Sequence, residues 1–469
     1  MEKLYAISPL DGRYHSKVEP LRDYFSESAL INHRIMVECE YFIFLISYLK
    51  SKGYPLKQLS KKETEYIREI YNLKDKNAFE VKKIEFQGDG KIKPTNHDVK
   101  AVEYYLKKTF ENKIKNNLEL IHFGLTSEDT NNIAYSLMIS GFIMDVFLKE
   151  TEKILKILME FSLKHASSVF PARTHGQIAS PTTFGKEMRN FYERIKRQND
   201  FIKDHRIMVK LNGAVGNYNS FVSAFPDIDW TDFSSRFIKH INTQFNYNLE
   251  INLYTTQIES HDSWIELFDR VRHLNSILIG LCQDIWRYIS DDLIILRPVD
   301  GEIGSSTMPH KINPINFENS EGNLQFANSM LEFFSSKFSV SRLQRDLTDS
   351  TVERNIGVAF GHSILAYNSF ITGMSKITLN ELMAARIVDE HPEVYAEAIQ
   401  TILRKYGIKN AYEMMKDLTR GHRITKKEIE NFIDRLQINE KIKKEIQKAV
   451  SLPYTGIASM LAKKTKIKN

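Results

Sequence analysis

The sequence of 469 residues has few of the residues that interrupt helices or cross-link chains. It contains 12 prolines and 20 glycines, and these gather at a few points with long periodic segments between them. Only two cysteines, Cys39 and Cys282, are present, which excludes a disulfide framework and a cysteine-based structural zinc site. The chain is therefore one of long regular segments joined at a small number of breaks.

Long hydrophobic runs and a strong charge of one sign are also absent. The longest apolar run, Tyr41 to Leu49, is far short of a membrane span. The formal net charge of +6 can help an anionic substrate approach, but it does not indicate a nucleic-acid-binding protein. No apolar signal-peptide region follows Met1. We therefore expect a cytoplasmic protein with neither a membrane nor a nucleic acid as partner.

Hydrophobic residues recur at helical spacing in the segments between the breaks. The stretch from Ile154 to Phe161 shows this spacing, and the stretch from Ile265 to Leu281 sustains it over more than four turns. No comparable stretch alternates with period two. Because the chain is too long for one ordinary core, we predict an all-α fold of three helical domains. These are residues 1–114, a central bundle of long helices over 115–370, and residues 371–469.

The breaks themselves predict helix ends. Phe123 to Asp129 opens a helix, with Thr126 and Asp129 spaced as a capping box. Pro171 to Pro181 separates two long helices, and turns are expected at Tyr406-Gly407 and Arg420-Gly421. Asn313-Pro314 predicts a further helix start, with asparagine as the cap and proline at the first helical position.

The segment before this last helix start is the most informative in the chain. Gly304 to Pro314 reads GSSTMPHKINP and places hydroxyls and a lysine in a loop that leads into a helix. Backbone N–H groups and the positive dipole end of a helix suit a developing oxyanion. The hydroxyl residues alone are equally typical of a polar surface loop. The eleven residues together indicate a catalytic loop.

Four further polar clusters lie at predicted helix junctions. Thr95 to Lys100 reads on its own as a capped helix start, and Thr126-Ser127 as a helix cap. Arg173 to Gln177 places a histidine beside a glycine in an interhelical loop, where it is either accessible for chemistry or structural. Ser341 to Arg354 carries polar groups at helical spacing, as a binding surface or a solvated face would.

Motifs for several other chemistries are absent from the sequence. It contains no HExxH, no phosphate-binding P-loop, no dinucleotide-binding glycine pattern and no GxSxG elbow. The 14 histidines show no metal-ligand spacing. We therefore expect the protein to use neither a metal nor a cofactor.

These clusters, taken together and in order, resemble one family. Gly304 to Pro314 is similar to the GSSxMPxKxNP signature of the fumarase/aspartase superfamily, whose members release fumarate by β-elimination. Over nearly its whole length the chain resembles the adenylosuccinate lyases within that superfamily. The blocks that carry this resemblance are Ser8–Tyr14, Thr95–Tyr104, Arg173–Gln177, Asn212–Tyr218, Tyr254–Glu259, Gly301–Asn323 and Ser341–Arg354. Ser260, where relatives have proline, and Thr307 depart from the pattern.

The resemblance implies a carbon–nitrogen lyase. It would release fumarate from adenylosuccinate to give AMP, and from the succinyl-carboxamide imidazole ribotide SAICAR to give AICAR. Ser305 is implied as the base and His175 as the acid at the leaving nitrogen. Lys311 would stabilise developing negative charge, and Glu318 would orient the imidazole of His175.

The family also implies a set of binding residues and an assembly. A substrate with a phosphate and two carboxylates carries roughly four negative charges, which calls for several cations and oriented donors. Arg13, Tyr14, Arg345, Ser350 and Arg354 fit the phosphate; Thr126, Ser127, Gln257, Ser306, Lys311 and Asn319 fit the succinyl carboxylates; Asn96, His97 and Asp98 fit the base, ribose or phosphate. The implied assembly is a homotetramer in which each site takes residues from three chains.

Two other functions remain open at this stage. Argininosuccinate lyase, aspartase and fumarase share the signature, but their substrates have no nucleotide phosphate. The Arg13-Tyr14 pair and the block from Arg345 to Arg354 would then have no phosphate to bind. A non-catalytic helical scaffold descended from such a lyase is the other alternative. Loss of Ser305, His175 or Lys311 would indicate it, and all three residues are present.

Overall fold

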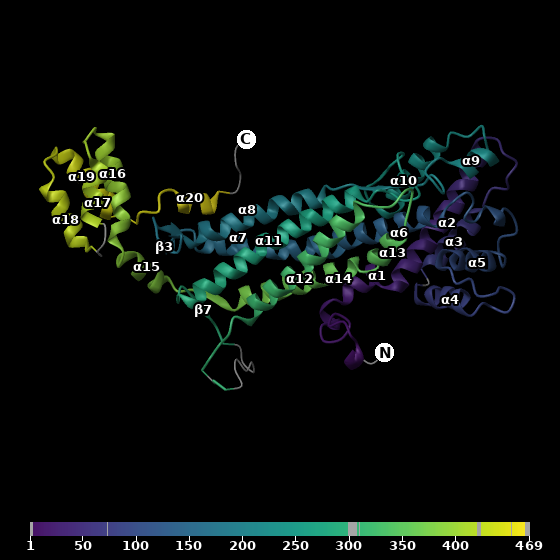
Figure 1. The fold of residues 1–469 in the computed structure, drawn as a ribbon, viewed down its shortest axis with the longest axis horizontal. Coiled ribbons are helices and arrows are strands. Elements are labelled where there is room, and N and C mark those ends of the chain that lie inside the picture. The colour runs from purple at the N-terminus through teal and green to yellow at the C-terminus, as the bar shows by residue number, and fades with distance from the viewer. Residues whose placement is uncertain are drawn as a thin grey trace. The chain divides into compact units, whose positions relative to one another are not determined.

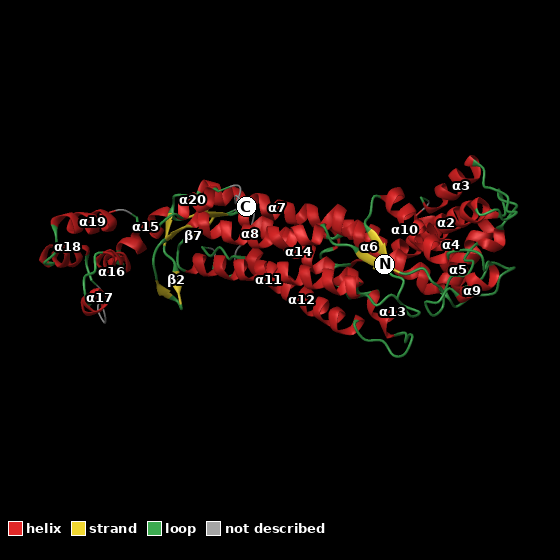
Figure 2. Cartoon of the chain, turned by 90° about the horizontal axis from the view of Figure 1, so that it is seen from above, coloured by secondary structure: helices red, strands yellow, loops and turns green. Residues whose placement is uncertain are grey.

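The computed structural model describes residues 3–72, 74–298, 307–308, 310–419, 424–451 and 453–464. This described part is built of α-helices with a few short strands (Figures 1 and 2), which confirms the predicted helical fold class. By its internal contacts the chain forms two compact units. Unit 1 comprises residues 1–151, 198–276 and 323–366, and unit 2 comprises 152–197, 277–322 and 367–469. The domain boundaries predicted near residues 114 and 370 stay a prediction.

Unit 1 holds the N-terminal helices and the residues around the start of α6. Its elements are α1 Arg22–Phe25, α2 Glu27–Ser51, α3 Lys61–Tyr71, α4 Lys74–Phe86, α5 Asp98–Phe110, α6 Ser127–Phe142, β5 Ile207–Val209, α9 Asn219–Ala224, α10 Trp230–Phe245, β6 Leu249–Ile251 and α13 Thr348–Glu353. Apolar side chains of α2 such as Ile35, Phe42 and Ile46 pack with those of α3, α4 and α5 in one core. Strands β5 and β6 pair in parallel.

Five long helices contribute residues to both units. They are α7 Leu148–Lys164, α8 Phe184–Lys203, α11 Asp262–Ser290, α12 Ile315–Phe338 and α14 Ile356–Ser375. Helices α7 and α11 contain the two stretches whose apolar spacing predicts a helix. Helix α12 begins one residue later than predicted, because the carbonyl of Pro314 accepts from the N–H groups of Phe317 at 3.0 Å and Glu318 at 3.3 Å. Pro314 therefore takes the cap position.

Unit 2 contains the remaining short strands and the C-terminal helices. They are β1 Val169–Phe170, β2 Arg173–Thr174, β3 Gln177–Ile178, β4 Thr182–Thr183, β7 Ile294–Leu296, β8 Ile377–Leu379, α15 Glu381–Asp389, α16 Ala396–Lys405, α17 Ala411–Thr419, α18 Lys426–Arg435, α19 Glu440–Ser451 and α20 Ala458–Lys463. The three strand pairs β1–β4, β2–β3 and β7–β8 are antiparallel. The turn predicted at Tyr406-Gly407 is present, with Gly407 at φ +71°; Arg420-Gly421 lies outside the described residues.

Helices α6 and α7 form one continuous helical stretch from Ser127 to Lys164. A π-helical turn over Ile143–Phe147 joins them, and the hydroxyl of Tyr24 donates to Asp145 Oδ2 at 2.9 Å beside it. This stretch is apolar and long enough to cross a membrane by length and composition alone. However, 83% of its apolar window is buried within the protein. Such burial is typical of a core helix in a protein interior.

The start of α6 is fixed by a buried ion pair. The capping box predicted from Thr126 and Asp129 is present, and the N–H of Thr126 donates to Asp129 Oδ2 at 2.9 Å. The other oxygen of Asp129 lies 2.6 Å from Lys210 Nζ, and both side chains are fully buried. Asp129 also accepts from the N–H groups of Asn212 at 3.0 Å and Gly213 at 3.1 Å. One carboxylate thus joins a helix start to the loop over residues 211–217.

We expect Lys210→Met to lower the free energy of unfolding by about 3–5 kcal/mol, because the substitution leaves the Asp129 carboxylate buried without its cation. The control is Arg236→Met, which removes an exposed i,i+4 partner of Asp232 on α10 and should shift the urea midpoint far less. Both are measured by urea denaturation at one protein concentration. Equal midpoints for the two variants would show that the buried pair does not stabilise the fold.

Candidate active site

Arg345 brings together several predicted binding residues in unit 1. Its Nη1 donates to Gln257 Oε1 at 3.3 Å, and its Nη2 lies 3.2 Å from Glu128 Oε2. Glu128 follows Ser127 in the first turn of α6, so the structure assembles Ser127, Gln257 and Arg345 in one place. Arg345 Nε lies 3.8 Å from Asp349 Oδ2, although Arg345 precedes α13 and is not part of a helix. A guanidinium with donors toward several groups is suited to bind an anion.

The loop over residues 211–217 holds Gln257 in this position. The side-chain amide of Gln257 donates to the carbonyl of Ala214 at 3.2 Å, and Asn212 Nδ2 donates to Thr255 Oγ1 at 2.8 Å. Gly216 has φ +79°, and a Cβ there would lie 2.3 Å from the carbonyl oxygen of Thr255. Only glycine permits this close approach. The blocks around 212–218 and 254–259 therefore form one support for the Gln257 amide.

The cluster Asn96-His97-Asp98 meets two arginines at the start of α5. Asp98 Oδ2 lies 2.9 Å from Arg34 Nη1 and 3.2 Å from Arg354 Nη2. Burial raises the pKa of Asp98, but Arg34 and Arg354 outweigh it and hold the pKa below its usual value. His97 caps the helix by accepting from the N–H of Lys100 at 3.2 Å, while Asn96 is exposed at φ +45°. The segment is thus both a capped helix start and a neighbour of Arg354.

The opening segment of the chain also lies beside Arg354. A cavity of about 260 Å³ is lined by Ser8, Asp11 and His15 from this segment and by Arg354 and Gly357. The predicted phosphate ligands Arg13 and Tyr14 lie between these lining residues in sequence, and the guanidinium of Arg13 is 5.9 Å from the ring centre of Tyr14. Ser350, in α13, donates through its hydroxyl to the carbonyl of Leu347 at 3.2 Å. Of the predicted phosphate ligands, Arg354 thus lines this cavity, and Arg13 and Tyr14 are sequence neighbours of residues that line it.

His175 occupies the tip of the β2–β3 hairpin in unit 2. His175 and Gly176 have φ +53° and +77°, as the two central residues of a type I′ turn require. Arg173 anchors this turn, with its Nε 3.5 Å from Asp291 Oδ2 and its Nη1 donating to the carbonyl of Gly176 at 3.3 Å. The His175 side chain is exposed and has no hydrogen-bond partner within the described residues. It is therefore accessible, as the polar loop predicts.

The signature loop is described only in part. Ser305 and Ser306 lie outside the described residues. Lys311 is exposed, and its N–H donates to the carbonyl of Met308 at 3.1 Å. Glu318, on the first turn of α12, accepts from Trp286 Nε1 at 3.1 Å, and Asn319 beside it is half-buried. Within the described part of one chain, Glu318 makes no contact with His175, so its orienting role stays a prediction.

A buried polar cluster beside Arg345 was not expected from the sequence. Glu128, His261 and Glu353 are 1–3% exposed, and their potential ligand atoms lie within 4.8 Å of one another. This geometry could hold a metal ion, yet the guanidinium of Arg345 already places positive charge against Glu128. The only signal in the sequence is the polar character of His261 and Glu353, since the three residues are far apart in the chain. The expected absence of a metal stays a prediction.

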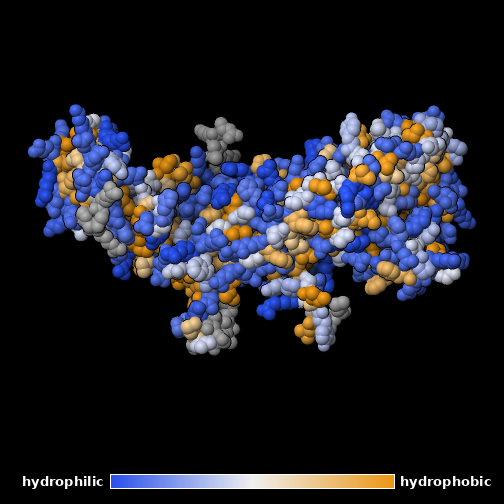
Figure 3. Space-filling model, viewed as in Figure 1, coloured by the Kyte–Doolittle hydropathy of each residue, from blue (hydrophilic) through white to orange (hydrophobic). Residues whose placement is uncertain are grey.

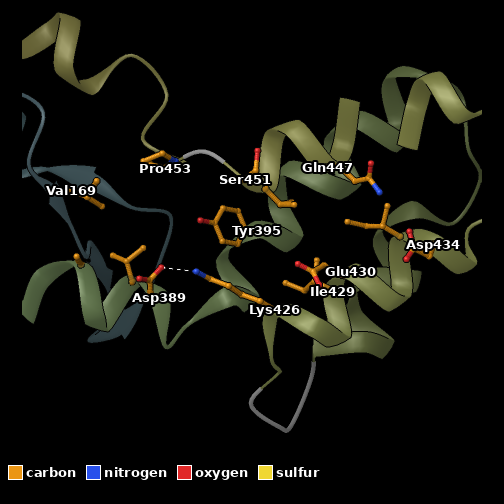
Figure 4. A pocket seen from close by; sticks show the side chains of 14 residues that line it. Val169, Asp389, Tyr395, Lys426, Ile429, Glu430, Asp434, Gln447, Ser451 and Pro453 are labelled. Carbon is orange, nitrogen blue, oxygen red and sulfur yellow. Dashed lines mark hydrogen bonds and ion pairs between the residues drawn. The ribbon is translucent and has the colours of Figure 1, made fainter. Parts of the chain in front are cut away.

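The cavity shown in Figure 4 is separate from the predicted residues. It has a volume of about 680 Å³ and is lined by side chains of β1, α15 and the helices that follow, including Tyr395, Ile429 and Gln447. Lys426 Nζ and Asp389 Oδ1 form an ion pair of 2.8 Å at its wall. None of the candidate catalytic or binding residues lines it. The carboxylates of Glu430 and Asp434 also line it, and we assign it no part in the candidate site.

Comparison with known proteins agrees with the resemblance drawn from the motifs. The family described as Lyase matches residues 12–326, and that described as Adenylosuccinate lyase C-terminal matches residues 341–455. The chain is 43% identical to the adenylosuccinate lyase of Legionella pneumophila (strain Corby) over 98% of both chains, and 41% identical to that of Escherichia coli (strain K12) over 98% of both. The enzyme of that name from Dictyostelium discoideum is 44% identical over 97% of both chains.

Solved structures support the fold in the same way. The 3-carboxy-cis,cis-muconate lactonizing enzyme from Pseudomonas putida superposes with a TM-score of 0.67 at 15% identity, over 95% of both chains. Identity this low establishes a common fold and nothing further. The close relatives, in contrast, match the chain from end to end at more than 40% identity. The chain therefore belongs to the adenylosuccinate lyase family.

Proposed function

We propose that this protein catalyses the β-elimination of fumarate from adenylosuccinate to give AMP, and from SAICAR to give AICAR. Its full-length similarity to adenylosuccinate lyases carries this proposal. The arrangement around Arg345 and Arg354 supports it, because a nucleotide substrate needs several cations for its phosphate. Other fumarate-releasing lyases have substrates without that phosphate. A cytoplasmic location is part of the proposal.

The reaction needs a base and an acid on opposite sides of the bond that breaks. Ser305, as alkoxide, takes the proton from the carbon next to the succinyl carboxylate, and negative charge spreads into that carboxylate. The C–N bond then breaks, its electron pair goes to nitrogen, and His175 supplies the proton that nitrogen gains. Histidine is the residue type suited to this role, since an imidazole can give and take a proton near neutral pH, and the His175 side chain is exposed. Lys311 and the N-terminus of α12 offer positive charge to the alkoxide.

Binding of the substrate is assigned to residues away from the reacting carbon. Arg345, Ser350 and Arg354, with Arg13 and Tyr14, hold the phosphate. The succinyl carboxylates are held by Thr126, Ser127, Gln257, Ser306, Lys311 and Asn319, while Asn96, His97 and Asp98 serve the base, ribose or phosphate. The assembled pair Gln257–Arg345 and the pair Asp98–Arg354 support this assignment, since each places a polar group beside a cation.

We further propose a homotetramer with shared active sites. Phe326 and Phe333, two turns apart on α12, are 52% and 53% exposed, whereas Leu324 and Leu331 of the same helix are fully buried. Exposed aromatic side chains at a seven-residue spacing are typical of a helix face that packs against another helix. Figure 3 shows apolar side chains at the surface among hydrophilic ones. The exposed His175 side chain fits a site that a second chain completes.

Purified protein should turn over adenylosuccinate but not argininosuccinate, and Ser305→Ala should reduce kcat by several orders of magnitude while still binding substrate. The hydroxyl acts on a proton and is not an anchor, so the loss falls on the chemical step. Fumarate release is followed spectrophotometrically, and substrate binding by calorimetry. A variant that keeps a tenth of wild-type kcat would remove Ser305 as the base. Turnover of argininosuccinate, or of neither substrate, would favour the alternative lyases or a scaffold.

Arg345→Ala and Arg354→Ala should chiefly raise KM for adenylosuccinate, because they grip a phosphate that does not react. Arg236→Ala, at an exposed arginine on α10, is the matched control and should leave KM unchanged. Initial rates across substrate concentrations separate KM from kcat. If kcat falls with KM unchanged, these arginines belong with the reacting groups instead.

Mixing inactive His175→Ala with inactive Ser305→Ala should restore activity. In a randomly reassembled oligomer, a site takes His175 from one chain and Ser305 from another. Each of the two residues is unmutated with a probability of about one half, so roughly a quarter of the sites contain both and recover activity. Co-expression or brief mild denaturation allows chains to exchange, and differently tagged subunits report that exchange. Mixed oligomers without activity would show that both residues come from one chain.

A further inference from the structure

The buried cluster beneath Arg345 contains more negative than positive charge when every group is ionised. Glu128, Asp349 and Glu353 supply three carboxylates, and buried Glu259 adds a fourth beside His261, whereas Arg345 and His261 supply at most two cations. The phenol of Tyr135 also lies within electrostatic reach and stays neutral, because burial raises its pKa. All these residues belong to unit 1. A buried region tolerates such an excess of negative charge poorly, so we expect one carboxylate of this cluster to take up a proton more readily than an exposed carboxylate does.

His261 and Glu353 neutralise each other. His261 Nε2 lies 3.4 Å from Glu353 Oε1, and the imidazole is enclosed by Trp264 and Phe338 with ring centres 4.6 and 5.3 Å away. Burial alone lowers the pKa of His261, but Glu353, Glu128 and Glu259 outweigh burial and raise it. Glu353 thus favours the cationic form of the imidazole. Arg345 is the cation in direct contact with Glu128, at 3.2 Å, and lies 3.8 Å from Asp349.

Glu128 is the carboxylate that is equipped to take up a proton. Burial and Glu353 raise the pKa of Asp349 as well, but its Oδ1 accepts from the N–H of Ser350 at 2.6 Å, which favours the ionised form. Glu128 has one oxygen, Oε2, near Arg345 and Asn131, while its Oε1 and the Oδ2 of Asp349 are both buried without a hydrogen-bond partner among the described residues. Glu128 is the more deeply buried of the two, with 2% of its side chain exposed against 6% for Asp349. Burial, with Glu353 next in importance, raises the pKa of Glu128 to about 8 despite Arg345 and His261. A free buried oxygen is the place where a proton can be added.

We propose that Glu128 is the internal counter-ion of Arg345 at alkaline pH, and that there it takes up one proton when a phosphate binds this guanidinium. The inference rests on the proposed function, which places a nucleotide phosphate on Arg345. An arriving dianion competes with Glu128 for the same cation, and two anions on one half-buried guanidinium would be less stable than one. The solvent supplies the proton to the Glu128 carboxyl. Glu128 is a positioning residue, since it acts on the ligand through Arg345.

This coupling sets the direction of the pH dependence. Binding that takes up a proton weakens as pH rises through the pKa of the unliganded group, because the proton becomes harder to obtain. AMP affinity should therefore be constant near pH 7 and fall by roughly tenfold per pH unit well above 8. The phosphate of AMP is fully ionised throughout this range, since its second pKa is about 6. The ligand itself thus contributes no proton.

Calorimetric titration of the full-length protein with AMP at pH 8.5, in buffers of different ionisation enthalpy, measures the proton uptake directly. Wild type should take up most of one proton for each AMP bound. Glu128→Gln should bind AMP without proton uptake and with an affinity that stays constant between pH 7.5 and 9.5. Glu119→Gln is the matched control, because this carboxylate is 91% exposed, and it should behave as wild type.

Asp349→Asn decides between the two carboxylates that face Arg345. If Asp349→Asn removes the proton uptake and Glu128→Gln keeps it, the assignment to Glu128 is overturned. AMP binding by wild type without any uptake at pH 8.5 overturns the coupling but leaves the proposed function intact. Absence of both AMP binding and turnover overturns the proposed function and this inference with it. The wild-type measurement needs no variant, so a misfolded Glu128→Gln would not remove the test.

Discussion

The buried pair of Asp129 and Lys210 is the contact on which the substrate-binding part of unit 1 depends. One carboxylate caps α6, neutralises Lys210, and accepts from the backbone of Asn212 and Gly213. The loop that it fixes carries Ala214, whose carbonyl holds the amide of Gln257, and Gln257 in turn accepts from Arg345. A chain of hydrogen bonds thus connects the Arg345 guanidinium to a single ion pair that has no access to water.

The two units carry different kinds of functional residue. Unit 1 contains Arg345, Arg354 and Gln257, whose polar groups are tied to carboxylates, amides or carbonyls. In unit 2, His175 and Lys311 are exposed. A group that only grips a phosphate gains from being held rigidly, since less entropy is lost on binding. A group that gives or takes a proton must also exchange it, which an exposed side chain allows.

The sequence was sufficient to predict the helical fold and several of its helix ends. Period-3.6 spacing located α7 and α11, and the polar breaks located the start of α6 and the interval between α7 and α8, because both signals are local. The β2–β3 hairpin was missed, since strands of two residues are too short to show alternation. The predicted start of α12 was one residue too early. The carbonyl of Pro314, and not that of Asn313, accepts the first hydrogen bonds of the helix.

The site was predictable only where its residues form blocks along the chain. Gln257 and Arg345 come from two such blocks, and the fold joins them. Glu128, His261 and Glu353 have no common sequence signal, because their proximity arises when α6, α13 and the residue before α11 pack together. Sequence patterns indicate which groups meet a ligand. The charged groups that hold these ligand-binding residues in place come together only when the chain packs. They set the affinity of a cation such as Arg345 for an anionic ligand and the pH range in which it binds. Sequence motifs therefore indicate the reaction more readily than they indicate the buried groups that control binding.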